Sequence, residues 1–228
     1  MVSALILALD GPIMTGTEGE HPRLSRAYRR LWWASGVDSI GTGIFTAALP
    51  LLAITITRDP RHVALLSAVA YLPWLLLSLP VGALLDRRDR VALMWRSQVI
   101  QAVLAGVIAA IAASGQLGIP TLALLAFLRG GCDVVLGDAA QAVLPDLVAK
   151  PLLPKANGQQ QAITTLGLQF VGPPVGSLLF AVGVAVPFGT DAASFVLSAA
   201  LLATLPRGDR SRRNIHRYVR RSSTVCAG

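Results

Sequence analysis

Apolar residues gather into six long runs separated by short polar links, and this pattern predicts six helices. A helix crosses the hydrocarbon core of a bilayer with about 20 mostly apolar residues. Glycine and proline recur inside the runs, which membrane helices tolerate better than soluble ones. The division between the last two runs depends on a short link near residues 182–189. The predicted spans are residues 31–55, 63–85, 92–114, 119–143, 160–182 and 187–205.

The composition argues against a water-soluble domain. Of the 228 residues, 54% are hydrophobic and 14% are charged, whereas a soluble domain carries about a quarter charged residues. The mean hydropathy is +0.61. Cys132 and Cys226 show no spacing typical of a disulfide or zinc framework. The chain therefore divides into a leader (1–30), an all-α transmembrane domain (31–205) and a tail (206–228), with Met1 or Met14 as its true start.

The basic residues predict the orientation in the membrane. The net charge is +8, and the links between spans alternate between many basic residues and few. The basic segments contain Arg23, Arg26, Arg29 and Arg30, then Arg87, Arg88 and Arg90, then Lys150 and Lys155, then the tail arginines from Arg207 to Arg221. The positive-inside rule places these segments, and hence both termini, in the cytoplasm of a multi-pass cell-membrane protein. This placement indicates that the basic residues set the membrane topology and contact anionic lipid, rather than bind nucleic acid.

An internal repeat relates the two halves of the chain at an offset of about 95 residues. GVD at 36–38, followed by AALPLL at 47–52, recurs as GCD at 131–133, followed by AVLPDL at 142–147. PVGALL at 80–85 recurs as PVGSLL at 174–179. Each unit holds three spans, so the second copy must be inverted in the membrane. Two inverted three-helix repeats are a transporter architecture.

Charged residues within the spans form the candidate site: Asp38, Arg129 and Asp133. Arg129 and Asp133 are four residues apart on one helix face and can pair. Asp38 and Asp133 are repeat equivalents at similar depth, so we expect them to meet across a central cavity. Two interpretations remain open. The group is either a substrate or proton site in which a carboxylate is neutralised during transport, or a structural ion pair that fixes the helices.

Other residues in and near the spans carry weaker expectations. Asp138 and Asp191 lie near opposite ends of their spans, so we expect both to be partly solvated. Small residues beside the charged group are expected to allow close helix packing. These are Gly36, Gly41, Gly43, Gly130 and Gly131.

The segment 82–91 resembles the signature loop between helices two and three of the major facilitator superfamily. The matching residues are Gly82, Leu84, Asp86, Arg87 and Arg90. Asp89 replaces a second glycine, as in a branch of small-molecule and siderophore exporters, and Val91 replaces a basic residue. The resemblance implies a tight turn at Gly82. It also implies charged contacts with neighbouring helix ends that form in one transport state and break in the other.

The fifth span contains a second, less specific resemblance to the same superfamily. Gly172, Pro173 and Gly176 are similar to its antiporter motif, from which Leu168 and Ser177 depart. Arg129 stands where the family has an arginine in helix four, but Asp133 replaces the glycine that follows it there.

The resemblance covers residues 24–206 and matches the N-terminal six-helix half of a twelve-helix fold. It implies export of a small molecule by alternating access, driven by a proton gradient without a bound cofactor. The second half would be a partner chain, a second copy or a downstream segment. The alternatives are a truncated fragment that does not transport, or a membrane scaffold whose basic tail recruits a partner or lipid.

The sequence argues against an enzyme. His21, His62 and His216 lie outside the spans, and no G-x-S-x-G, H-E-x-x-H or Cys/His dyad is present, so no catalytic or metal site is expected. Asp86 and Asp89 superficially resemble a magnesium-diphosphate motif, but the arginines interleaved with them would offset the charge of a metal site.

Overall fold

The structure, a computed structural model, describes residues 25–57 and 59–204. Among these residues the regular elements are all helices. They are α2 (Arg26–Ile56), α3 (Pro60–Arg87), α4 (Arg90–Ser114), α5 (Ile119–Leu147), η1 (Lys150–Leu152), α6 (Leu153–Thr165), the π-helical η2 (Leu166–Val171), α7 (Gly172–Val182) and α8 (Val186–Ala203). The segment from η1 to α7 forms one long element, so six helices are long and apolar enough to cross a membrane. This confirms the predicted fold class, including the division before α8. The predicted leader up to residue 24 and the basic tail lie outside the described residues.

Side chains and backbone at the links fix where several helices begin and end. The Asp59 carboxylate accepts a hydrogen bond from the Arg61 backbone N–H at 2.9 Å and caps α3. Asp89, at the position of the superfamily's glycine, accepts from Val91 N–H at 3.0 Å and caps α4. Gly115 ends α4 in the left-handed region, with φ of 69°. The aspartate that departs from the signature loop therefore starts the third span.

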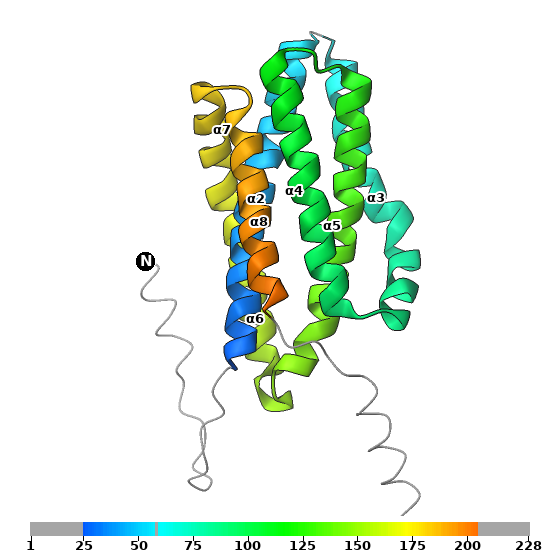
Figure 1. The fold of residues 1–228 in the computed structure, drawn as a ribbon, viewed down its shortest axis with the longest axis vertical. Coiled ribbons are helices and arrows are strands. Elements are labelled where there is room, and N and C mark those ends of the chain that lie inside the picture. Colours follow the sequence, from blue (N-terminus) through cyan, green and yellow to red (C-terminus); the bar gives the residue numbers. More distant parts are fainter. Residues whose placement is uncertain (1–24, 58, 205–228) are drawn as a thin grey trace, which may run out of the picture.

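The six membrane-length elements run alternately up and down, so the described chain begins and ends at the same end of the bundle (Figure 1). α2 packs against α7 and α8, α5 packs against α3 and α4, and α4 packs against α8. In the repeat, α2 corresponds to α5, α3 to α7 and α4 to α8. If each helix is replaced by its equivalent, the same set of contacts results. Such a pattern is expected of two inverted three-helix units.

The core consists of two apolar clusters, one toward each end of the bundle. The first includes Tyr28, Met94 and Leu202, and the second includes Phe45 and Phe188. Buried polar side chains occupy the level between them. These include Gln98, Gln101, Arg129 and Asp191. Ser198 is also buried, but it donates to the carbonyl of Ala34, which belongs to the first cluster. The candidate site therefore lies between two apolar layers of the core.

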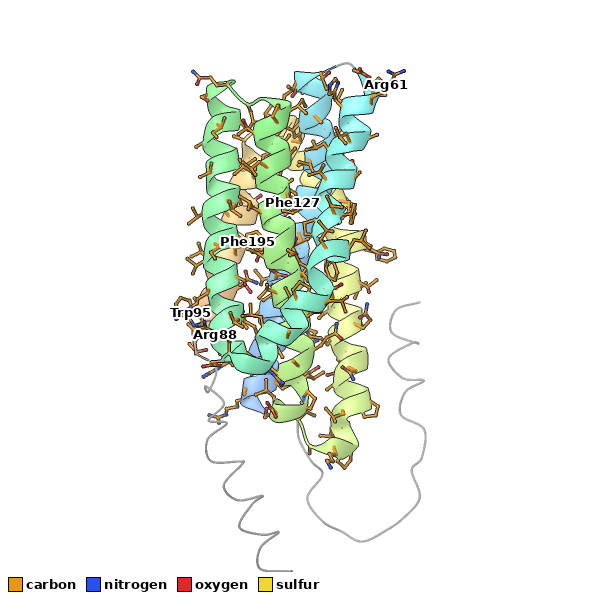
Figure 2. The ribbon with its side chains drawn as sticks, turned by 90° about the vertical axis from the view of Figure 1, so that its right-hand side faces the viewer. Arg61, Arg88, Trp95, Phe127 and Phe195 are labelled. Carbon is orange, nitrogen blue, oxygen red and sulfur yellow. The ribbon has the colours of Figure 1, made fainter. Side chains whose placement is uncertain are left out.

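Most of the described basic residues lie at one end of the bundle, whereas Arg129 lies in its middle. Arg88 and Trp95 lie near the lower end and Arg61 lies at the upper end (Figure 2). The start of α2, the α3–α4 link and the α5–α6 link also lie at the lower end (Figure 1). Arg30 of α2 donates to the Thr204 carbonyl at 2.8 Å, which joins the two ends of the described chain there.

Candidate functional site

A cluster of buried charges in the middle of the bundle is centred on Arg129 of α5. The Arg129 side chain is 3% exposed. Its Nη1 lies 3.7 Å from Oδ2 of Asp133, which confirms the pair predicted from their spacing along one helix. Its Nη2 lies nearer, at 3.1 Å, to Oδ2 of Asp191 on α8. One guanidinium is therefore shared between two carboxylates from different helices.

The expectation that Asp191 is partly solvated is wrong. Asp191 is fully buried, because α8 begins at Val186 and presents this carboxyl to the interior beside α5 rather than to the end of the helix. A Cβ on Gly41 would clash with Ser194 Oγ and would lie 2.7 Å from Asp191 Oδ1, so the glycine of α2 leaves the space that these two side chains of α8 occupy. The contact between Arg129 and Asp191 could not be predicted from residue spacing, because helix periodicity identifies pairs within one helix and these residues lie on α5 and α8. Asp138 is partly exposed, as expected.

Two phenylalanines hold the Arg129 guanidinium from its flanks. Its central carbon lies 3.9 Å from the ring centroid of Phe45 and 5.0 Å from that of Phe195. Arg129 Nη2 also donates to Thr42 Oγ1 at 3.4 Å. Phe195 is completely buried and lies at about mid-height of the bundle in Figure 2. The aromatic faces stabilise a desolvated cation. Neither ring could be predicted from the sequence, because a phenylalanine in an apolar span is not distinguishable from any other core residue.

Asp38 and Asp133 are both bound by glutamines of α4. Gln98 Nε2 donates to Asp38 Oδ1 at 2.7 Å, and Gln101 Nε2 donates to Asp133 Oδ1. Both glutamines are completely buried. The two repeat-equivalent carboxylates are therefore linked through α4 at similar depth. The sequence feature that could have indicated these contacts is a pair of glutamines, three residues apart, in an otherwise apolar span.

Arg90 of the signature loop contacts a neighbouring helix end, as expected. Its Nη1 donates to the carbonyl of Ala142 at 2.5 Å and lies 4.0 Å from the Asp146 carboxylate. Both residues belong to the last two turns of α5, and the dipole of a helix favours a cation near its C-terminus. The loop between α3 and α4 is thereby joined to the helix that carries Arg129.

The expected tight turn at Gly82 is wrong. α3 remains helical through Gly82 and Leu84 to Arg87, and the turn comes at residues 88–89. Nothing lies within 4 Å of a Cβ built on Gly82, so the glycine is not required for packing within the chain. The side chains of Asp86 and Arg87 lie outside the described ones.

The motif in the fifth span forms a close seam with α2. A Cβ on Gly172 would lie 2.5 Å from Gly43 Cα, and one on Gly176 would lie 2.6 Å from the Ile44 carbonyl oxygen. The helices therefore touch backbone to backbone, which small residues permit in membranes. Pro173 lacks an N–H, and the chain before it is π-helical. Gly36, Gly41, Gly43, Gly130 and Gly131 are likewise packed against other helices, as expected.

Six antiparallel membrane-length helices in two inverted units are an architecture found in multi-pass membrane transporters. The buried ion pairs lie within the second unit, and Gln101 of α4 links the first unit to Asp133. The chain belongs to the family described as transmembrane secretion effector (MFS_3), within the major facilitator superfamily, and the family model matches residues 20–221. It is also similar to macrolide efflux protein A of Streptococcus pyogenes and of its serotype M6 strain. Each is 26% identical over 152 residues, which cover 67% of this chain and 37% of the relative. The match thus spans little more than a third of these relatives.

Proposed function

We propose that this chain exports a small molecule across the cell membrane by proton-coupled alternating access. The main support is the charge cluster at mid-bundle. Arg129 is shared by Asp133 and Asp191, and among the described residues Asp38 has no cation within ion-pair distance. A charge at the bilayer centre costs about 2.5–3.5 kcal/mol on insertion scales and more in simulations. An excess of acids held there at such cost is suited to binding a proton or a substrate.

The chain acts in this proposal as one six-helix half of a larger transporter. The match to only 37% of each macrolide efflux protein supports a second unit. That unit is a downstream segment, a partner chain or a second copy. Most of the described basic residues belong to the start of α2, the α3–α4 link and the α5–α6 link, which lie at one end of the bundle (Figure 1). This placement supports a cytoplasmic location for both termini.

The test is transport in proteoliposomes with an imposed pH gradient. A labelled macrolide is the first probe, because the relatives are named for macrolide efflux. The full chain is assayed alone and together with a second six-helix unit. We expect movement that stops when the gradient is collapsed and that falls in Asp38→Asn and Asp133→Asn. Asp138→Asn is the matched control, since it removes an acid of α5 outside the cluster.

Each outcome bears on a separate part of the proposal. Movement only with the second unit supports the half-transporter, whereas full activity of the monomeric chain alone contradicts it. Movement that is undiminished in both site variants rules out the proposed mechanism. Absence of gradient-driven movement of any compound in a panel of macrolides and other small molecules, with and without the second unit, rules out proton-coupled export.

A further inference from the structure

The glutamines of α4 each leave one buried atom without a partner. Oε1 of Gln98 and Oε1 of Gln101 are buried and accept no hydrogen bond from the described residues. Their amide nitrogens do have partners, the carboxyl groups of Asp38 and Asp133. Buried polar atoms in folded proteins are nearly always hydrogen-bonded. Each amide is therefore only half satisfied while the carboxylate beside it is ionised.

One proton on the carboxyl group would supply the hydrogen-bond donor that the buried amide oxygen lacks. A protonated carboxyl has one O–H donor and an acceptor oxygen, and a primary amide has both kinds of group. The acid can donate to the amide oxygen while it accepts from the amide nitrogen. If the amide of Gln98 is turned over, two oxygens face each other, and again a proton is what joins them. Both orientations of the amide favour the protonated acid.

Electrostatics distinguishes Asp38 from Asp133. Arg129 and Asp133 on α5 and Asp191 on α8 are the charged groups that face Asp38. The charged residues of α3 and α6 lie at the helix ends, and η2 and α7 have none. Arg129 already serves two carboxylates, at 3.1 and 3.7 Å. An ionised Asp38 would be a third anion with no cation in ion-pair range.

We propose that Asp38 and Gln98 form a proton-binding site, an acid–amide pair in which Asp38 carries the proton and Gln98 positions it. Asp133 stays ionised beside Arg129. Loading forms one O–H bond on Asp38 and takes one proton from water, and release returns that proton with no other bond changed. The pair joins α2 to α4, so release removes a hydrogen bond between these two helices. Its role in transport rests on the proposed function, but proton binding itself can be measured without a substrate.

The test is infrared difference spectroscopy of the purified full chain, labelled with ¹³C-aspartate, between acidic and alkaline pH. We expect a carboxylic C=O band that appears on acidification, shifts in D₂O and is lost in Asp38→Asn. Gln98→Leu should move the band to higher frequency, because the carbonyl loses its amide donor. Gln161→Leu, the same change at an exposed glutamine of α6 outside the cluster, is the matched control and should leave the band in place.

Two results overturn the proposal. One is the absence of any aspartate C=O band that changes with pH and depends on Asp38. The other is a band that Gln98→Leu leaves unmoved, or that Gln161→Leu moves equally. The D₂O shift in the wild-type chain provides a measurement that needs no variant to fold. If the chain shows the band but moves no substrate, the acid–amide pair is supported and the proposed function is contradicted. If the chain transports substrate with the proton gradient but shows no band, the proposed function is supported and the acid–amide pair is contradicted.

Discussion

Replacement of Gly172 by alanine tests the backbone contact between α2 and α7. The new Cβ would lie 2.5 Å from Gly43 Cα and 2.7 Å from Gly43 C. Ordinary van der Waals contact begins at about 3.4 Å, so the two backbones must separate by about 0.9 Å at this point. A flexible side chain can rotate away from such a contact, but Gly43 has none. The strain must therefore be taken up by movement of a whole helix.

Overpacking of this kind typically costs about 1–3 kcal/mol, and we expect the free energy of unfolding to fall by that amount. Gly106→Ala is the matched control. It adds the same methyl group to α4, where nothing lies within 4 Å, and alanine favours a helix over glycine by about 1 kcal/mol. Gly106→Ala should therefore be neutral or stabilising.

The assay is thermal unfolding of the purified protein in detergent, followed by tryptophan fluorescence and by the monodisperse fraction in size-exclusion chromatography. Gly172→Ala should unfold at a lower temperature than the wild type, and Gly106→Ala should not. If Gly172→Ala matches the wild type, or if both variants are equally destabilised, the seam is not as close as the structure shows.

Three further changes can be measured with the same unfolding assay. Arg129→Gln leaves Asp191 buried without a counter-charge and should cost about 3–5 kcal/mol. Adding Asp191→Asn should recover much of this, and no recovery would contradict the pairing. Asp89→Ala removes the N-cap of α4 and should cost about 1 kcal/mol, whereas Asp89→Ser should retain most of the stability. Tyr28→Phe removes a buried hydroxyl that donates to the Ala156 carbonyl at 3.0 Å. It should cost about 1 kcal/mol, and an unchanged unfolding temperature would show that the bond contributes nothing.

Features of this protein that depend on local interactions could be predicted from its amino-acid sequence. Six apolar runs of membrane length predict six helices whatever their packing. The Arg129–Asp133 pair follows from a separation of four residues on one helix. The turn assigned to Gly82 shows the limit of a motif, because a single glycine does not end a helix in an apolar span. α3 continues to Arg87 and the chain turns just before the Asp89 cap.

The packing between helices was decided only in the tertiary structure. The apolar runs, the repeated segments and the basic links establish the number and alternating direction of the spans, the inverted repeat and the end that carries most of the positive charge. They do not determine that Asp191 meets Arg129 or that Gln98 binds Asp38. Those contacts depend on how each helix is rotated about its axis and which neighbour it faces. A membrane helix is apolar on the lipid side and largely apolar inside, so its hydrophobic pattern carries little information about that rotation.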